Sequence, residues 1–235
     1  MNLREKTLAK MIDQSYLKPN ATVQEILKFC KVVRRYNFKA AYVLPTNVPI
    51  LVKELENTGI KVATAIGFPF GANFPEVKAF EAEKMIEAGA EEIDMVINIG
   101  ALKSSNYKLV YEDIKKVVDA AQKVVTKVIL ETYYLTDDEI VKGCQISKDA
   151  GADFVKTCTG FTPTGAKVEH IRLMRKTVGT KMGVKASGKI WDIDICLSMI
   201  KAGANRIGVS KGEVLIDELH KKYNGSYEIE EIKEE

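Results

Sequence analysis

The stretch DAGADFVKTCTG (149–160) sets the pattern of the whole chain. It reads as the end of a helix, a glycine cap at Gly151, a short turn and then an apolar strand. The same phrase recurs as EAGAEEIDMVIN (87–98) and KAGANRIGVSKG (201–212). Repeated helix-to-strand junctions, with helical patterns between them, predict parallel βα units.

Eight apolar runs are the candidate strands. They are nearly continuous in apolar residues, as expected for strands covered on both faces. Eight βα units in 235 residues fit a single (β/α)8 TIM barrel, which typically has about 250 residues. A doubly wound sheet is the alternative, weakened because no G-x-G-x-x-G sequence follows any candidate strand. The expected strands cover residues 10–17, 40–45, 61–67, 92–98, 127–132, 153–158, 182–187 and 206–210.

The chain has no linker rich in Pro, Gly or Ser and no low-complexity tract. We therefore expect one domain over residues 1–235, with an extra N-terminal helical segment before the first strand. The acidic tail SYEIEEIKEE (226–235) is expected to be helical or frayed.

Composition limits the classes of function. A net charge of +3, without a basic cluster interleaved with aromatic residues, argues against nucleic-acid binding. Short, interrupted apolar runs predict no membrane span, and the charged N-terminus predicts a cytoplasmic protein. The four cysteines form no CxxC pair and are expected to be free thiols. The two histidines, His170 and His220, lie in charged helical patterns and are expected at the surface.

Ionisable residues inside the apolar runs are the candidates for catalysis. A barrel places its active site at the C-terminal ends of its strands, and a buried charge is costly unless it is paired. A structural ion pair is the alternative for any one of them. Lys127 begins its run and is expected in a solvated position, whereas the role of Glu131 stays open. The remaining candidates are Asp13, Asp94, Lys156 and Lys185.

Lys156 and Lys185 stand out as a pair. They are 29 residues apart, about one βα unit, so they are expected at similar depth on neighbouring strands. Desolvation and a like charge both lower the pKa of a lysine, and a neutral amine attacks carbonyls to form a Schiff base. Asp94, two strands away from Lys156, is expected to counter the charge and act in proton transfer.

Three strand ends carry small hydroxyl residues and glycines: TCTG (157–160), ASGK (186–189) and VSKG (209–212). Backbone N–H groups in such turns bind phosphate, and barrels often hold phosphate at the loops after their seventh and eighth strands. The alternative is that these glycines only make tight turns.

Together these segments resemble the deoxyribose-phosphate aldolase family, whose members are metal-free class I (Schiff-base) aldolases. The resemblance runs from about Met11 to Gly212. The segments that carry it are IDQSYLKPNAT (12–22), AIGFPFG (65–71), GAEEIDMVINIGALK (89–103), KVILET (127–132), GADFVKTCTGF (151–161), GVKASG (183–188) and AGANRIGVSKG (202–212).

The resemblance implies a role for each matching residue. Lys156 corresponds to the Schiff-base lysine, Lys185 to the lysine that keeps it deprotonated, and Asp94 to the proton-relay aspartate. Asp13 and Ser15 correspond to residues near the substrate. No metal or cofactor is implied. Gly160, Gly188, Ser210 and Gly212 correspond to parts of the phosphate site. From their place at the same strand ends, Ser187, Lys189 and Lys211 are also expected there.

The chain departs from the family pattern at several positions. DQS (13–15) stands where Asp-His-Thr is common, and Tyr42 replaces a frequent cysteine. Lys189, Trp191 and Lys211 replace a glycine, an arginine and a serine around the expected phosphate.

The resemblance implies reversible cleavage of 2-deoxy-D-ribose 5-phosphate to D-glyceraldehyde 3-phosphate and acetaldehyde. It also implies a homodimer or homotetramer. Another class I barrel aldolase, acting on a different sugar phosphate or a keto acid, is one alternative. A phosphate-binding barrel without aldolase activity, in which Lys156 is a phosphate ligand, is the other. In some members a tyrosine near the C-terminus assists proton transfer, which makes Tyr223 and Tyr227 of interest here.

Overall fold

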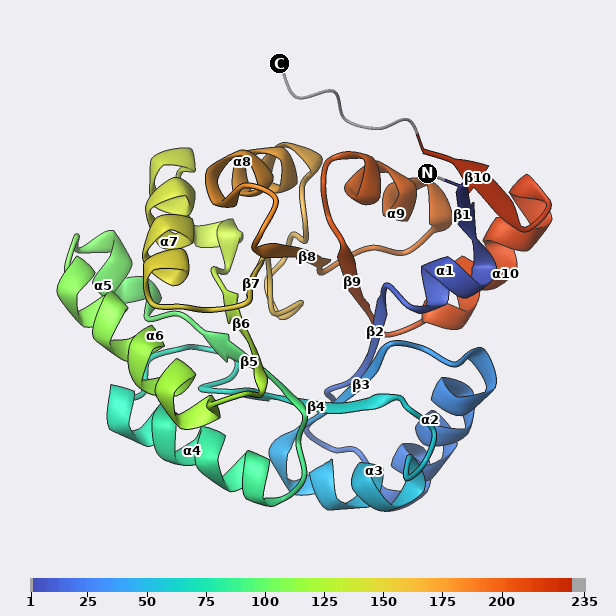
Figure 1. Ribbon diagram of the computed structural model, residues 1–235, viewed down its shortest axis with the longest axis horizontal. Coiled ribbons are helices and arrows are strands. Elements are labelled where there is room, and N and C mark those ends of the chain that lie inside the picture. The colour runs from blue at the N-terminus through green and yellow to red at the C-terminus, as the bar shows by residue number, and fades with distance from the viewer. Residues whose placement is uncertain (1, 230–235) are drawn as a thin grey trace.

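The eight predicted strands form a closed ring of parallel strands, in the order in which they occur along the chain (Figure 1). In this computed structural model residues 2–229 are described. β2 (Ile12–Tyr16) closes the ring by pairing with β9 (Arg206–Val209), which confirms the TIM barrel. The other strands of the ring are β3 (Ala40–Val43), β4 (Lys61–Ile66), β5 (Glu92–Val96), β6 (Val125–Ile129), β7 (Phe154–Lys156) and β8 (Gly183–Ser187).

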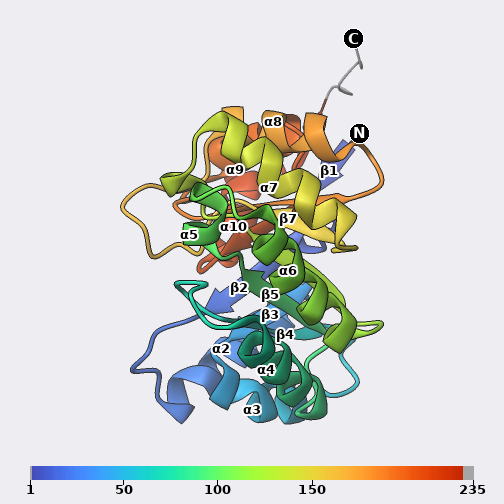
Figure 2. The same ribbon diagram turned by 90° about the vertical axis from the view of Figure 1, so that its left-hand side faces the viewer.

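Helices surround this ring and run back from the C-terminal end of each strand to the start of the next (Figures 1 and 2). Two short 3-10 turns, η1 (Pro45–Asn47) and η2 (Thr132–Tyr134), follow β3 and β6. The helices of the outer layer are α2 (Val23–Tyr36), α3 (Val48–Glu54), α4 (Pro75–Glu87), α5 (Ile99–Lys103), α6 (Tyr107–Ala121), α7 (Asp137–Asp149), α8 (Val168–Val178), α9 (Ile193–Lys201) and α10 (Gly212–Tyr223).

The three repeated phrases end their helices in the same way. Gly89, Gly151 and Gly203 have φ of +99°, +88° and +110°, a region that favours glycine. After α4 the N–H of Ala90 donates to the carbonyl of Met85 (2.9 Å), as in a Schellman motif, and equivalent bonds follow α7 and α9. The predicted glycine caps are therefore confirmed, and each one turns the chain directly into the next strand.

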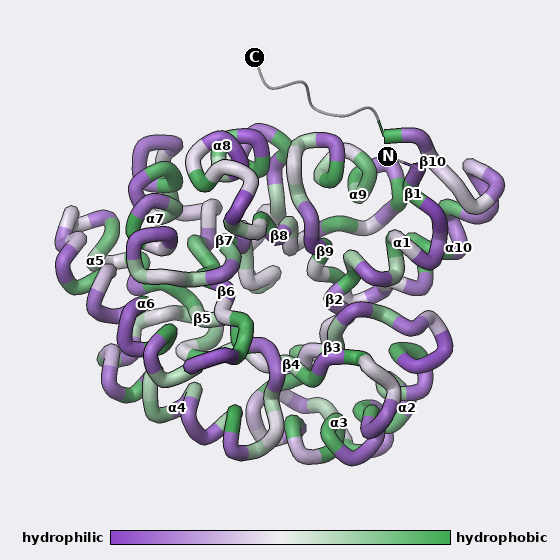
Figure 3. Tube along the Cα trace, in the orientation of Figure 1, coloured by the Kyte–Doolittle hydropathy of each residue, from purple (hydrophilic) through white to green (hydrophobic). Residues whose placement is uncertain are grey.

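Two different cores result from this arrangement. The large apolar core lies between the strands and the helices, and Figure 3 shows hydrophobic and hydrophilic residues alternating around the helices that cover it. Inside the ring the apolar cluster is small and consists of Ala40, Tyr42 and Ala63.

All four cysteines are free, as expected, and the structure buries all of them. No helix within residues 2–229 is both long enough and apolar enough to cross a membrane.

The two ends of the described chain meet in a small sheet. β1 (Asn2–Arg4) pairs antiparallel with β10 (Ser226–Glu228), and α1 (Glu5–Ala9) is the expected N-terminal helical segment. The expectation of a helical or frayed tail is wrong for residues 226–228, because their backbone hydrogen bonds go to a strand more than two hundred positions away in sequence. Residues 230–235 of the tail lie outside the described residues.

The glycine caps make a testable difference to stability. Gly89→Ala is expected to lower the free energy of unfolding by more than ~1 kcal/mol, because φ there is positive and a Cβ would lie 2.7 Å from Cγ2 of Val52. The matched control is Gly100→Ala in α5, where a Cβ would lie 3.8 Å from Asn98 Oδ1 and the effect is expected to be neutral or stabilising by up to ~1 kcal/mol. Urea unfolding of both variants checks this, and equal midpoints would contradict it.

Candidate active site

Seven charged side chains gather inside the barrel. Successive residues of a strand point to opposite faces, so the inward positions of neighbouring strands meet in layers. Four cations and three carboxylates point inward, and none of their side chains is more than 8% exposed. They are Asp13 on β2, Glu92 and Asp94 on β5, Lys127 on β6, Lys156 on β7, Lys185 on β8 and Arg206 on β9.

The strand register brings the two predicted lysines together. Lys156 stands directly opposite Lys185 in the pairing of β7 with β8, which confirms their placement at similar depth on neighbouring strands. Lys185 in turn stands opposite Arg206 on β9, and Asp94 stands opposite Lys127 on β6. The cations therefore form a nearly continuous arc that would repel itself without the carboxylates inside it.

Asp94 is the shared partner of both lysines. Its Oδ2 accepts hydrogen bonds from Lys156 Nζ (2.8 Å) and from Lys185 Nζ (2.8 Å). Complete burial by itself would raise the pKa of Asp94, but the neighbouring lysines, with Lys156 the strongest, hold this pKa well below its usual range. Asp94 is therefore an ionised carboxylate that links two amines through one oxygen.

The two lysines differ in how firmly they are held. Lys185 Nζ lies 2.7 Å from Asp13 Oδ2 as well as 2.8 Å from Asp94 Oδ2. Within residues 2–229 Lys156 has Asp94 as its one carboxylate partner. Burial lowers the pKa of Lys185 to about 8, Asp13 and Asp94 oppose this shift, and Lys156 adds to it. Lys156 is the amine that can leave its partner at smaller cost.

The prediction of a solvated Lys127 is wrong. This lysine is fully buried, and its Nζ lies 2.5 Å from Glu92 Oε2 and 3.3 Å from Asp94 Oδ1. β6 begins two residues before it, at Val125, so Lys127 lies within the strand and turns inward. Burial would lower the pKa of Lys127, but Asp94, Asp13 and Glu92 raise it, which favours the charged form of this lysine.

Three residues of the cluster were missed from the sequence. Tyr42 donates to Asp94 Oδ1 (2.9 Å), and Arg206 donates to Asp13 Oδ1 and Glu92 Oε2. The signal for Glu92 was its position two residues before Asp94, which puts both on the same face of β5. The signal for Arg206 was a charged residue at the start of an apolar run, on the same face of its strand as Gly208, two residues later. A tyrosine in an apolar strand gives no such signal, because tyrosine is common in strands.

Asp13 and Ser15, expected near the substrate, both point into the barrel from β2. Asp13 accepts from Arg206 Nε (2.8 Å) at one oxygen and pairs with Lys185 at the other. Ser15 is half-buried, and its hydroxyl donates to the carbonyl of Val209 (3.1 Å). Asp13 thus belongs to the charged cluster itself, whereas Ser15 lies one layer nearer to the C-terminal ends of the strands.

Glu131, whose role stayed open, fixes the loop that follows β7. It has a positive φ (+55°) and is buried just beyond β6. Its Oε2 accepts from the backbone N–H of Thr159 (3.1 Å) and from the Thr159 hydroxyl, and its Oε1 accepts from the Thr162 hydroxyl (3.4 Å). Glu131 therefore holds the segment that leads from Lys156 to the expected phosphate turn.

The expected phosphate residues lie at the C-terminal ends of β7, β8 and β9, which are neighbours in the ring. The first two loops touch, since the N–H of Ala166 donates to the carbonyl of Gly188 (3.0 Å). Ser187 and Gly188 are buried, and Lys189 Nζ lies 5.5 Å from the centre of the Trp191 ring. The exposed members of the set are Gly160, Lys189, Ser210 and Lys211.

Gly212 differs from the rest of the phosphate set. Its N–H donates to Gln14 Oε1 (2.7 Å), and Gln14 Nε2 donates to the carbonyl of Ser210 (3.1 Å). A Cβ at Gly212 would meet Gln14, Ile12 and Phe38, so this residue faces the helix layer. The departure at Gln14 thus ties β2 to the start of α10 and uses the N–H of Gly212.

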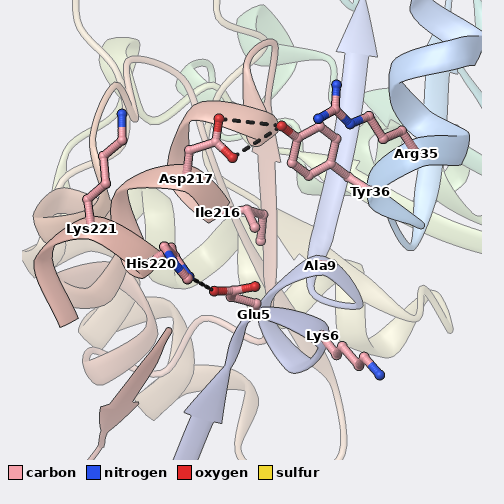
Figure 4. A pocket seen from close by; sticks show the side chains of 9 residues that line it. All are labelled: Glu5, Lys6, Ala9, Arg35, Tyr36, Ile216, Asp217, His220 and Lys221. Carbon is pink, nitrogen blue, oxygen red and sulfur yellow. Dashed lines mark hydrogen bonds and ion pairs between the residues drawn. The ribbon is translucent and has the colours of Figure 1, made fainter. Parts of the chain in front are cut away.

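A hollow of about 410 Å³ lies at the other end of the barrel, between α1, α2 and α10 (Figure 4). Its lining includes Tyr36, whose hydroxyl donates to Asp217 (3.1 Å), and His220, whose Nδ1 lies 2.7 Å from Glu5. His220 is exposed, as predicted. The buried charges lie elsewhere, so we do not assign the chemistry to this hollow.

The tail tyrosines also lie away from the charged cluster. Tyr223 is the last residue of α10 and donates to Asp194, and Tyr227 on β10 pairs with Leu3 on β1. The contacts of these two tyrosines among the described residues therefore go to α9 and to the small terminal sheet, and none goes to the charged cluster. Within residues 2–229 no three His, Cys, Asp or Glu side chains are grouped as metal ligands would be.

Comparison with known proteins agrees with this geometry. A family model described as DeoC/LacD family aldolase matches residues 7–213. The deoxyribose-phosphate aldolase of Clostridium tetani is 54% identical over 212 residues, covering 90% of this chain and 98% of that protein. The one of Caldanaerobacter subterraneus subsp. tengcongensis is 51% identical over 218 residues, covering 92% and 94%.

A solved structure of similar shape is the tetrameric deoxyribose phosphate aldolase of Aeropyrum pernix. It superposes with a TM-score of 0.85 at 31% identity, covering 94% of this chain and 93% of that one. With a family model over most of its length and close relatives along nearly all of it, this chain belongs to the DeoC/LacD family of aldolases.

Proposed function

We propose that this chain cleaves 2-deoxy-D-ribose 5-phosphate reversibly to D-glyceraldehyde 3-phosphate and acetaldehyde, through a Schiff base on Lys156. The observation that carries the proposal is the carboxylate of Asp94, shared at 2.8 Å by Lys156 and Lys185 inside a closed barrel. The names of the relatives support the substrate, because two bacterial proteins more than half identical to this chain are deoxyribose-phosphate aldolases.

The charge balance of the cluster favours one neutral amine. Fully ionised, its four cations and three carboxylates carry a net charge of +1, and burial penalises such an excess. Loss of one proton makes the interior neutral. Although burial lowers the pKa of Lys185 to about 8, Lys185 pairs with both Asp13 and Asp94, whereas Lys156 has one carboxylate partner among the described residues. On this difference in ion pairing we assign the neutral, nucleophilic amine to Lys156.

The proposed reaction begins when Lys156 Nζ adds to the C1 carbonyl of the open-chain sugar. A proton from Lys185, relayed by Asp94, lets water leave and gives a protonated imine. The C3 hydroxyl then gives its proton to the relay of Asp94 and Lys185, the C2–C3 bond breaks, and the electron pair of that bond moves toward the imine nitrogen as an enamine. C3 becomes the aldehyde carbon of glyceraldehyde 3-phosphate. Protonation at C2 and hydrolysis of the imine release acetaldehyde and the free amine.

Asp94 and Lys185 move and hold protons in this scheme. Because one oxygen of Asp94 contacts both amines, a proton can pass between protonated Lys185 and the group bound at Lys156 without reaching solvent. The substrate phosphate would lie at the ends of β7, β8 and β9, with Lys189 and Lys211 as candidate cations. The loop after β7, held by Glu131, connects the two parts of the site.

A cytoplasmic homo-oligomer is part of the proposal. The relative from Aeropyrum pernix is described as tetrameric. This chain exposes two large apolar side chains near the start of α4, Phe70 and Phe74, each 78% exposed. Large exposed apolar side chains, where they form a contiguous patch, often mark contacts with other chains.

Borohydride trapping tests the nucleophile. Incubation with acetaldehyde and borohydride is expected to leave a reduced two-carbon adduct on Lys156, because the reductant fixes the imine as a secondary amine. Peptide mass spectrometry locates the adduct. Lys78, which is also fully buried but pairs with Asp113 outside the barrel, is the internal control and is expected to stay unmodified. An active enzyme without an adduct on Lys156 would end the Schiff-base proposal.

Lys185→Leu tests the second amine. The substitution leaves three cations and three carboxylates, so the interior is neutral while Lys156 is still protonated. Activity near neutral pH is expected to fall by at least ~100-fold, and the acidic limb of the pH–rate profile is expected to move to higher pH. Lys61→Leu, at an exposed ion pair with Glu91, is the control and should leave the profile unchanged. A wild-type rate and profile for Lys185→Leu would make Lys185 purely structural.

Lys211→Ser tests whether Lys211 binds the phosphate group of the substrate. If Lys211 holds the phosphate equally in the ground and transition states, KM for the phosphorylated sugar should rise by ~10-fold or more while kcat hardly changes. Activity on unphosphorylated deoxyribose should be nearly unaffected, because the lost contact is absent there. Equal losses on the two substrates would instead assign Lys211 to the fold or the loop. Steady-state kinetics with both sugars decides between these outcomes.

A further inference from the structure

Tyr42 lies inside the barrel, in the middle of β3, and is only 2% exposed. It stands opposite Ser15 on β2 and Ala63 on β4. The small side chains of these neighbours leave the space into which the ring extends. From β3 the ring reaches across the barrel to the lysines on the far strands.

The hydroxyl of Tyr42 is the donor in its hydrogen bond with Asp94. It accepts from Lys127 Nζ (2.6 Å), so its single proton must go to a carboxylate. Asp94 Oδ1 lies at 2.9 Å, whereas Glu92 Oε2, at 3.2 Å, already accepts from Lys127 and Arg206. Burial and the nearby carboxylate of Asp94 raise the pKa of Tyr42 well above its usual range, so the proton stays in place.

The two oxygens of Asp94 have different hydrogen-bond partners. Oδ1 is occupied by Tyr42, with Lys127 nearby at 3.3 Å. Oδ2 is left to face Lys156 and Lys185. The bond also withdraws negative charge from the carboxylate, which weakens its hold on protons of both amines.

The ring of Tyr42 lies closer to the amine of Lys185 than to the amine of Lys156. Lys185 Nζ lies 3.9 Å from the ring centre, whereas Lys156 Nζ lies 5.9 Å from it. The face of an aromatic ring attracts a cation, and the attraction is stronger where water is excluded. The ring therefore favours the charged form of Lys185 over the charged form of Lys156.

We infer that Tyr42 is a positioning residue that keeps the proton of the lysine pair on Lys185 and off Lys156. The hydroxyl does so by fixing Asp94, and the ring does so by contact with the ammonium of Lys185. This inference rests on the proposed Schiff-base function and adds to it the device that distinguishes the two amines.

The direction of the expected pH effect follows from the groups around Asp94. Without the tyrosine hydroxyl, the carboxylate of Asp94 carries more negative charge and favours the protonated form of Lys156. A higher pH is then needed to free the amine. The ionisable groups that face this region from the surrounding strands are Asp13, Glu92, Asp94, Lys127, Lys156, Lys185 and Arg206.

Tyr42→Phe is the sharpest test, because it removes the hydroxyl and keeps the ring. Near neutral pH kcat is expected to fall about 10-fold. The acidic limb of the pH–rate profile is expected to move to higher pH, by roughly half a pH unit to one pH unit. Raising the pH should recover most of the lost rate. A purely structural defect would lower the rate at every pH alike. Tyr42→Leu, which also removes the ring, should move the limb further.

The matched control is Tyr36→Phe, which removes a hydroxyl bonded to Asp217 in the hollow at the other end of the barrel (Figure 4). Its rate and pH profile should equal those of the wild type. The second readout is the rate at which acetaldehyde and borohydride label Lys156 at fixed pH. That rate should fall in Tyr42→Phe at neutral pH and recover at higher pH.

The possible outcomes separate the inference from the proposed function. If wild-type Lys156 takes no adduct, the Schiff-base function fails and the role of Tyr42 fails with it. If wild-type Lys156 is labelled but Tyr42→Phe keeps the wild-type pH profile and labelling rate, only the inference about Tyr42 is overturned. A loss that pH does not recover, in a variant that unfolds at the wild-type temperature, also overturns it.

Discussion

The carboxylate of Asp94 is the contact on which the interior of this barrel depends. One of its oxygens receives Lys156 and Lys185, each at 2.8 Å, and the other receives Tyr42. Removing one partner of a buried ion pair typically costs about 3–5 kcal/mol, because the remaining charge is left without compensation. The charged groups are therefore mutually dependent, and the one cation in excess of the carboxylates supplies the proton that the proposed chemistry moves.

The closed ring makes this contact possible. Asp94 on β5 reaches past β6 to lysines on β7 and β8, a span that the curvature of a barrel shortens. Barrel interiors are usually filled by branched apolar side chains. Here the inward positions of β3 and β4 include the alanines Ala40 and Ala63, which leave volume for long charged side chains. The hydrophobic stabilisation of the fold comes mainly from the apolar layer between the strands and the helices.

Buried polar contacts outside the ring hold the ends of its strands in place. Lys78 on α4 is fully buried and donates to the carbonyl of Val96, at the end of β5, and to Asp113 on α6. Glu131 similarly fixes the loop after β7. Both contacts act on segments next to the catalytic candidates, β5 with Asp94 and β7 with Lys156. The positions of Asp94 and Lys156 are thus set by the strand register and by bonds that hold the strand ends from outside.

The sequence alone determined the architecture and the central pair of lysines. The repeated glycine caps and apolar runs predict βα units because they depend only on local backbone preferences, and a spacing of one βα unit places Lys156 beside Lys185. Tertiary structure alone decided that Lys127 points inward, that Tyr42 and Arg206 join the cluster, and that the chain ends pair as strands. Local patterns could not show this, because the partners come from distant strands and because the inward face of a strand depends on where it begins and how the ring closes.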